Sequence, residues 1–374
     1  MKYCVTCVQP DTRPGINFDH EGVCSACRAY KERMEIDWSV REDEIKSIAE
    51  WARNRNAPYD CVVGISGGKD SHVQALYAKE ELGLNALLVN CAPDNISEVG
   101  QENLENLVQC GFDMISLKPN PKVQREVARR AFFEHGNFVK PLEYPLYASA
   151  YLIADRFDIP LVIQGENPAE TLGIEEYVEK GGDAMQWANS PTVAGGNASD
   201  WIGDGIDEQD MRLYQFPSID ALKEKGVKAI FLGHYLEAWS NSNNTEFAVS
   251  RGLRGRPEHD PMATGRLNKY FSIDVELKLV NQFVKYLKFG FGAVTDEVCY
   301  DIREGRITRE DALELVRKYD GAISERYIQQ LVDYLGITMG EFWAAIDKFV
   351  NHDLFYKDPE TGNYRRRFVV GEGL

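Results

Sequence analysis

A short glycine-containing segment that follows an apolar run constrains this chain more than any other feature. The run Cys61-Val62-Val63-Gly64-Ile65 leads directly into Ser66-Gly67-Gly68-Lys69-Asp70-Ser71. This pattern predicts a buried strand that turns through glycines into a helix. Glycines let backbone N–H groups approach phosphate oxygens, the helix start adds partial positive charge, and Lys69 adds a full charge. Because Asp70 also offers oxygen to a metal ion, we predict a nucleotide site here.

The spacing of the glycines excludes the two commonest nucleotide-binding loops. No glycine lies five residues before Gly68-Lys69, as the P-loop requires, and the three spaced glycines of the dinucleotide fingerprint are missing. The hexapeptide instead resembles the Ser-Gly-Gly-x-Asp-Ser signature of the PP-loop ATP pyrophosphatases, which cleave ATP between the α and β phosphates to adenylate a carbonyl oxygen. An ordinary strand-to-helix turn is the alternative, but it has no use for Lys69, Asp70 and two serines.

Two cysteine pairs near the start predict a metal site. Cys4-x-x-Cys7 and Cys24-x-x-Cys27 have the spacing of tetrahedral four-cysteine zinc sites. We expect Zn²⁺ to have a structural role, because four protein thiolates close the coordination shell. An iron–sulfur cluster and disulfides are the alternatives, and a chain without a secretory signal should not keep disulfides in the cytosol.

Composition and charge narrow the class of protein. The 374 residues are 44% hydrophobic and 11% aromatic, as in a globular enzyme. The net charge of -17 opposes wide contact with nucleic acid, whose phosphates require clustered Lys and Arg. No apolar stretch is long enough for a membrane span, and Met1 is not followed by a hydrophobic leader. We expect a cytoplasmic protein that binds neither nucleic acid nor membrane.

The order of apolar runs and helical patterns predicts an α/β fold with a doubly wound parallel sheet. Expected strands are 59–65, 86–91, 113–117, 161–164 and 229–232. Expected helices are 71–82, 97–109, 123–134, 147–157, 309–319, 324–335 and 340–349, and another that begins near Ser39 with a capping box to Glu42. No further clear strand is expected after residue 241. We divide the chain into a zinc-binding segment (1–38), a PP-loop domain (39–240) and a helical subdomain (241–374).

Two strand ends carry candidate catalytic groups. Ligands of such sheets bind at the carboxyl ends of the strands. After strand 161–164, a turn at Gly165 presents Glu166 and Glu170, which we predict share Mg²⁺ with Asp70. Alternatively, the two glutamates cap the following helix. After strand 229–232, His234 is a candidate to accept a proton from ammonia, although such a histidine is as often structural.

Two segments outside the predicted sheet are further candidates for substrate binding. The stretch 285–292 combines Lys285 and Lys288 with aromatics and glycines, and is expected to dock an anionic substrate or pyrophosphate. Solvated helix charges are the alternative for the arginines that follow it. The segment 181–205 is too long for a simple connector and is either a substrate lid or a surface insertion.

The motifs together resemble a narrower family, the N-acetyl sugar amidotransferases. The resemblance runs through the cysteine pairs, Asp37-Trp38, Arg41-Glu42, the 66–71 loop, Gly165-Glu166-Asn167 and Lys288-Phe289-Gly290-Phe291-Gly292, and continues through Ile302-Arg303, 306–309 and Asp320-Gly321. Residues 195–204 match no motif of the family, so the resemblance does not identify the sugar contacts.

The resemblance implies an activity and its partners. Such enzymes convert the acetamido group of a nucleotide-linked N-acetyl sugar into an acetamidino group, with ATP, Mg²⁺ and ammonia from a separate glutaminase, with or without a cyclase-like subunit. It implies that Ser66, Gly67, Gly68 and Ser71 bind the pyrophosphate, that Asp70 and Glu170 hold the metal, and that Val89 and Asn90 meet adenine. Gly165 is a further predicted contact of ATP. Lys69 and Lys288 would neutralise the leaving group.

Other functions compatible with the sequence are a PP-loop tRNA-modifying enzyme and a non-catalytic nucleotide-binding scaffold. The acidic charge opposes the first, and the intact Lys69-Asp70 pair opposes the second. The sequence leaves open the sugar, its UDP or CMP carrier, the ammonia route and whether the chain forms a homo-oligomer.

Overall fold

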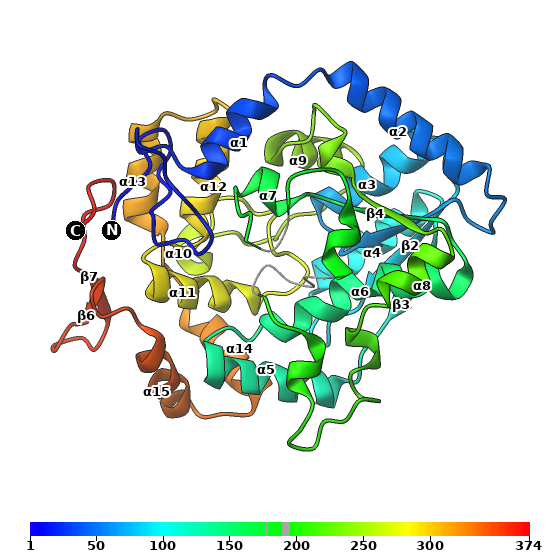
Figure 1. The fold of residues 1–374 in the computed structure, drawn as a ribbon. Coiled ribbons are helices and arrows are strands. Elements are labelled where there is room, and N and C mark those ends of the chain that lie inside the picture. The colour runs from blue at the N-terminus through cyan, green and yellow to red at the C-terminus, as the bar shows by residue number, and fades with distance from the viewer. Residues whose placement is uncertain (177–178, 189–194) are drawn as a thin grey trace.

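A five-stranded parallel sheet lies at the centre of the computed structural model, which describes residues 1–176, 179–188 and 195–374 (Figure 1). The strands are β1 (Cys61–Ile65), β2 (Ala86–Cys91), β3 (Asp113–Leu117), β4 (Leu161–Gln164) and β5 (Lys228–Phe231). The predicted fold class is confirmed. The bounds of β2, β3 and β4 are those predicted, whereas β1 begins two residues later than expected and β5 is displaced by one residue.

The strand order places the ends of β1 and β4 side by side. The order is β3-β2-β1-β4-β5, with Ile65 of β1 beside Asn90 of β2 and Val63 of β1 beside Ile163 of β4. The chain therefore passes from β1 outward to β3 and then returns to the opposite side of β1. Such a reversal leaves a crevice at the carboxyl ends of the two central strands, where doubly wound sheets bind their ligands.

Helices cover both faces of the sheet, because alternate residues of each strand point to opposite sides. Val62 packs with Ala150 and Ala154 on one face, whereas Val63 packs with Leu76 and Leu107 on the other. The helices of this part are α2 (Trp38–Arg53), α3 (Lys69–Leu76), the π-helical turn η1 (Tyr77–Glu81), α4 (Glu98–Gln109), α5 (Pro121–His135), α6 (Lys140–Phe157), α7 (Pro168–Thr171) and α8 (Ile219–Glu224).

Several predicted helix starts differ from the structure, three of them for an identifiable reason. The side chain of Asp37 accepts a hydrogen bond from the Ser39 N–H at 3.1 Å and caps α2, so Ser39 is not the cap. Helix α3 was expected to begin at Ser71, but it begins at Lys69 because Gly68 is its N-cap. Helix α6 begins at Lys140 and includes Pro145, a residue that in a sequence usually indicates a helix boundary.

The C-terminal part is mainly helical, as predicted. It contains α9 (Asn241–Ser250), α10 (Pro261–Thr264), α11 (Lys278–Phe289), α12 (Ala293–Arg303), α13 (Arg309–Tyr319), α14 (Glu325–Leu335) and α15 (Met339–Phe349). The expectation of no further strands is wrong, since β6 (Phe355–Lys357) and β7 (Tyr364–Arg366) form an antiparallel pair. Helices α11 and α12 were not predicted, and they flank the Phe289-to-Gly292 turn.

The N-terminal segment and the C-terminal helices share one hydrophobic core. Buried Cys4, Cys7 and Val8 pack with Val294 and Val298 of α12. The Arg309 guanidinium donates to the main-chain oxygen of Cys7 at 3.0 Å. The two ends of the chain lie together, and the Leu374 N–H donates to the Met1 oxygen at 3.4 Å (Figure 1). Helix α1 (Ser25–Arg33) then leads from this core toward α2.

The segment 181–205, expected to be either a lid or a surface insertion, is anchored by aromatic side chains on both sides of its central part. Residues 189–194 lie outside the described residues. In the short 3₁₀ helix η2 (Ala184–Ala188), the buried Trp187 ring stacks on Tyr147 with centroids 4.5 Å apart. The 3₁₀ helix η3 (Ala198–Trp201) buries Trp201. The remaining 3₁₀ turns are η4 (Arg212–Tyr214) and η5 (Leu232–His234).

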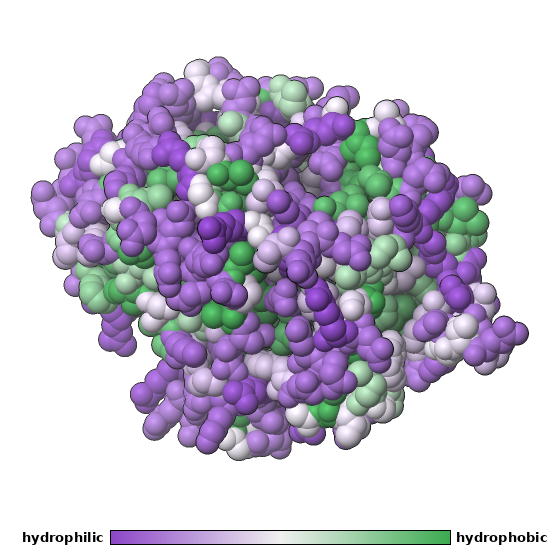
Figure 2. Space-filling model, turned by 180° about the vertical axis from the view of Figure 1, so that it is seen from behind, coloured by the Kyte–Doolittle hydropathy of each residue, from purple (hydrophilic) through white to green (hydrophobic). Residues whose placement is uncertain are grey.

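One face of the molecule is mostly polar (Figure 2). On the face opposite to that of Figure 1, polar side chains predominate and apolar side chains form separate patches between them (Figure 2). Among the described residues, no helix has the length and apolar character needed to cross a membrane.

Candidate active site

The 66–71 loop follows β1 at the crevice beside β4. The Ser66 N–H donates to the Ser71 hydroxyl at 2.9 Å, which closes the turn. Gly67 has a φ of +83°, and a Cβ there would lie 3.1 Å from Cγ of Leu104, so the turn requires glycine. Gly68 caps α3 without a side-chain hydrogen bond, which leaves N–H groups of the first helical turn free for an anion.

Lys69 and Asp70 contact each other and the C-terminal part of the chain. The Lys69 Nζ lies 2.5 Å from Asp70 Oδ2 and 4.8 Å from the centroid of the Phe271 ring. Asp70 Oδ1 accepts a hydrogen bond from the Asn244 amide at 2.7 Å. The Lys69 side chain is only 7% exposed, so its charge is held close to the loop. Asn244 and Phe271 had no role in the sequence analysis, because nothing in their local sequence indicates this contact.

The three predicted Mg²⁺ ligands line one cleft. Asp70, Glu166 and Glu170 surround it together with Arg33 and Arg303. By accessible surface Glu166 is an exposed residue, although protein groups surround its carboxyl within the cleft. The partial loss of hydration and the charge of Asp70 raise the pKa of Glu166 to about 7, while Lys69 opposes the rise. Carboxylate oxygens are the ligands that Mg²⁺ prefers, so the donor set fits the ion.

His234 is held at both ring nitrogens. Its Nδ1 lies 2.7 Å from Glu170 Oε1, and its Nε2 contacts the Arg41 guanidinium of α2. Because a guanidinium only donates, Nε2 accepts and Nδ1 carries the hydrogen that Glu170 accepts. The Gly181 N–H donates to the same Glu170 oxygen at 3.2 Å. The ring thus orients Glu170, and its predicted transfer of a proton from ammonia stays a prediction.

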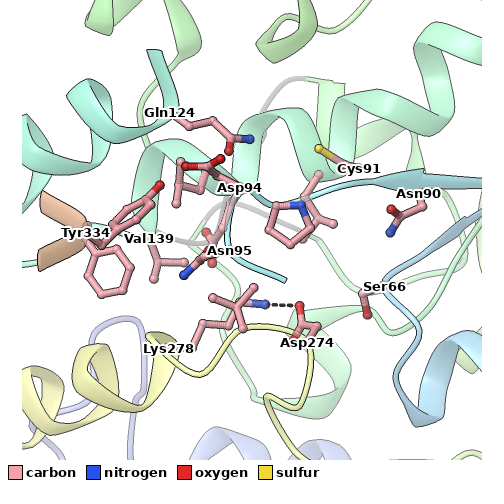
Figure 3. A pocket seen from close by; sticks show the side chains of 16 residues that line it. Ser66, Asn90, Cys91, Asp94, Asn95, Gln124, Val139, Asp274, Lys278 and Tyr334 are labelled. Atoms are coloured by element: carbon pink, nitrogen blue, oxygen red, sulfur yellow. Dashed lines mark hydrogen bonds and ion pairs between the residues drawn. The ribbon is translucent and has the colours of Figure 1, made fainter. Parts of the chain in front are cut away.

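A second cavity, here called the nucleotide cavity, opens at the ends of β1 and β2 (Figure 3). Ser66 and Asn90 lie at one end of it, and Val139 and Tyr334 lie at the other. The Asn90 amide donates to the Ile65 oxygen at 3.1 Å, which fixes its side chain. Gln124 of α5 also lines the cavity, and its buried side-chain oxygen has no hydrogen-bond partner among the described residues.

The side chains or Cα atoms of the other two predicted ATP contacts, Val89 and Gly165, have different surroundings. The Val89 side chain is buried against α6 and does not line the nucleotide cavity. Gly165 accepts a hydrogen bond from the Gly233 N–H at 3.0 Å, and a Cβ there would lie 2.8 Å from the Gln74 amide nitrogen. This glycine therefore allows β4 to approach α3 closely. A main-chain contact of Val89 or Gly165 with ATP stays a prediction.

Lys288 lies apart from the 66–71 loop. Its Nζ donates to the main-chain oxygen of His135 at 2.6 Å, and it lines a cavity to which no residue of the loop contributes. The predicted role of Lys288 toward pyrophosphate is therefore untested, and the described contacts do not bring it together with Lys69.

The four N-terminal cysteines are brought together, as the predicted zinc site requires. Their sulfur atoms lie within 4.8 Å of one another and all four residues are buried. Main-chain N–H groups point at two of the sulfurs, from Cys24 to Cys4 Sγ at 3.3 Å and from Gln9 to Cys7 Sγ at 3.4 Å. Four clustered thiols with N–H donors fit a tetrahedral Zn²⁺ site.

The C-terminal part of the chain matches a known family. Residues 264–368 match the model of the LPS biosynthesis protein WbpG-like, C-terminal domain. This match covers less than half of the chain, and it shows what residues 264–368 are similar to. The match supports the resemblance predicted from the sequence, and it covers α11–α15 together with Phe271, whose ring contacts Lys69.

Comparisons with curated proteins and with solved structures do not identify a family for this chain. No curated protein matches the sequence. Among solved structures, an NMN synthetase from Francisella tularensis is similar at 13% identity, with 60% of this chain and 100% of that chain covered and a TM-score of 0.28. The strand order β3-β2-β1-β4-β5 and the 66–71 loop define the fold. The loop and the WbpG-like domain together indicate a nucleotide-using biosynthetic enzyme.

Proposed function

We propose that this protein is an ATP-dependent amidotransferase that converts the acetamido group of a nucleotide-linked N-acetyl sugar into an acetamidino group. The observation that carries the proposal is the contact between the 66–71 loop and the WbpG-like part of the chain, in which the Phe271 ring covers Lys69. ATP activation and recognition of a surface-sugar precursor would then take place in one crevice.

The chemistry requires activation because an amide oxygen is a poor leaving group. The amide oxygen attacks the α-phosphate of ATP, and pyrophosphate departs as the bond between the α and β phosphates breaks. Ammonia then adds to the O-adenylyl imidate carbon, and AMP leaves with the former amide oxygen. The product is an amidine, and the surplus proton is lost to solvent.

The residues of the loop would stabilise the departing pyrophosphate. Free N–H groups at the start of α3 and the charge of Lys69 would bind its oxygens, where preorganised donors are most effective. Mg²⁺ held by Asp70, Glu166 and Glu170 would supply further positive charge at the phosphates. The Glu170 carboxylate is oriented for this by His234 and the Gly181 N–H.

The proton that attacking ammonia loses would pass to solvent, because Glu166 is assigned here to the metal ion. Ammonia would come from a separate glutaminase subunit, with or without a cyclase-like subunit.

The reaction itself is the test. Purified protein is incubated with ATP, Mg²⁺, an ammonium salt and UDP- or CMP-linked N-acetyl sugars, and AMP and the product mass are followed. AMP formed together with replacement of one oxygen by NH supports the proposal. AMP without a modified sugar, or no AMP even with ammonia in excess, contradicts it.

A further inference from the structure

A cavity of about 440 Å³ lies where the N-terminal segment, the α5–α6 connection and α11 meet. Four of its side chains are basic, although the whole chain has a net charge of -17. We call it the cationic cavity, and the residues used in the argument are Arg13, Lys140, Lys285, Lys288, Asn281 and Phe291. The 66–71 loop contributes nothing to it, so it is separate from the ATP phosphates.

The basic groups exceed the carboxylates that neutralise them. Arg13 and Lys285 share a single partner, Asp296, whose second oxygen lies 2.5 Å from the Lys285 Nζ. The Lys288 Nζ donates to the main-chain oxygen of His135 and lies over the Phe289 and Phe349 rings. Among the described residues, neither Lys288 nor Lys140 has a carboxylate within 4.0 Å. Two further acids, Glu143 and Glu176, also line the cavity.

The basic groups are close enough to repel one another. Burial and the charge of Lys140 lower the pKa of Lys288. Burial, Lys140 and Lys288 likewise lower the pKa of His135 at the same wall. Burial and the charge of Arg13 lower the pKa of Lys285. An anion bound among these groups would relieve this repulsion.

The rest of the wall suits a larger ligand than a simple anion. The buried side-chain oxygen of Asn281 has no hydrogen-bond partner among the described residues, so it can accept from a hydroxyl or an N–H group. The Phe291 ring, with Arg13 and Lys285 each 4.8 Å from its centroid, forms an apolar floor.

We infer that the cationic cavity binds the diphosphate of a nucleoside-diphosphate sugar, with Asn281 accepting from a hydroxyl or the base; this inference rests on the proposed function. Glu143 lines both the cationic cavity and the nucleotide cavity, so the two are neighbours. A sugar attached to the bound diphosphate would extend toward ATP. Lys288 would then bind the diphosphate of the acceptor substrate, and not the pyrophosphate that leaves ATP.

Direct binding tests the inference without requiring turnover. UDP-N-acetylglucosamine is titrated calorimetrically into the full-length protein, its Lys140→Ala and Lys288→Ala variants, and the control Lys122→Ala, which removes an exposed lysine of α5 outside the cavity. We expect each cavity variant to lose about tenfold or more in affinity, as for a lost hydrogen bond to a charged group. The control should bind like the wild type, and ATP affinity should be unchanged in all three variants.

Two results would overturn the inference. One is wild-type affinity in both cavity variants, and the other is a wild-type protein that binds neither UDP-N-acetylglucosamine nor UDP. An equal loss of ATP affinity would also count against it, because it would place the lysines at the ATP site. Lysine-dependent binding without AMP formation would contradict the proposed reaction but leave the site standing, so the two failures are distinguishable.

Discussion

Lys69 is the residue on which the proposed reaction depends most. Its charge is buried beside Asp70 and the Phe271 ring, so that it is already in place when ATP binds. Preorganised charge of this kind stabilises the transition state without rearrangement. We expect Lys69→Ala to lower kcat for AMP formation by about 10²–10³, as for loss of one oxyanion donor.

The measurement is AMP release under saturating ATP, compared with Lys122→Ala as an exposed control. Circular dichroism should show the same fold for both variants. A Lys69→Ala enzyme with kcat within twofold of the wild type would contradict the assignment of the loop to pyrophosphate departure.

Glu166 should make stability depend on pH. Its folded-state pKa is raised to about 7 by partial loss of hydration and by Asp70, above the value of 4.5 for a free glutamate. The folded protein thus holds a proton that the unfolded chain releases, so this stabilisation is full below about pH 4.5 and is lost as the pH rises through about 7. Glu166→Gln removes the carboxylate that becomes charged.

We therefore compare the Tm of the Glu166→Gln variant with that of the wild type, without added Mg²⁺. The variant's Tm, relative to the wild type, should be higher at about pH 8 than at about pH 5 by a few degrees. The Tm difference between variant and wild type at each pH isolates the contribution of Glu166 from that of the other titratable groups. A difference that stays constant across the range would mean that Glu166 is not perturbed in the folded state.

The sequence indicated the residues of the site that lie in one local motif, and it did not indicate those brought in from elsewhere. Lys69 and Asp70 are adjacent to the glycines that define the loop, so their role could be inferred from spacing alone. Asn244, Phe271 and Gln124 reach the site from distant helices and connections. Tertiary packing brings these three residues to the site, and no periodic pattern in the sequence predicts that contact.

At the scale of the element, the turn between β1 and α3 combines backbone strain with function. Gly67 has a φ of +83° and lies against Leu104 of α4. Gly336, which ends α14 with a φ of +63°, has no atom within 4 Å of a built Cβ. Alanine at either position should destabilise the protein by about 1–2 kcal/mol through the left-handed conformation.

Only Gly67→Ala should also lower AMP formation, because the added methyl requires Leu104 or the phosphate-binding loop to shift by a few tenths of an ångström. Denaturant titration and an AMP assay of the two variants separate the effects. Equal activity of both variants would show that the loop tolerates a side chain, which the PP-loop assignment does not allow.

Elements were predictable where local sequence sets both ends. Strands β2, β3 and β4 are short apolar or alternating runs bounded by polar or turn residues, and their predicted bounds are confirmed. The start of α6 was missed because Pro145 usually ends a helix, yet here it lies within one. The three-residue strands β6 and β7 are too short to produce a pattern and exist through their mutual pairing.

At the scale of the whole molecule, the four-cysteine cluster belongs to the same core as the C-terminal helices. Arg309 of α13 donates to main-chain oxygens of Cys7 and Cys4, at 3.0 and 3.4 Å. The Thr12 hydroxyl donates to the Phe289 oxygen of α11 at 2.5 Å, next to Arg13 of the cationic cavity. The fold of the N-terminal segment therefore determines where one wall of that cavity lies.

This connection predicts what loss of the metal will do. Cys24→Ser should lower bound zinc below one equivalent per chain, because structural Zn²⁺ requires its full set of thiolates. Zinc binding carries about 10 kcal/mol or more in small zinc-binding peptides, so the segment should unfold locally. Hydrogen exchange should then rise in α12 and α13, which pack on the cysteines, while β1 and β2 stay protected.

Cys110→Ser is the matched control, since Cys110 lies outside the cluster and should leave zinc content and exchange unchanged. Iron and its visible absorbance in the purified wild type would identify an iron–sulfur cluster instead of zinc. Because Arg13 would lose its fixed position, Cys24→Ser should weaken UDP-N-acetylglucosamine binding more than ATP binding. Exchange that rises equally in β1 and β2 would show that the metal supports the whole fold rather than the shared core alone.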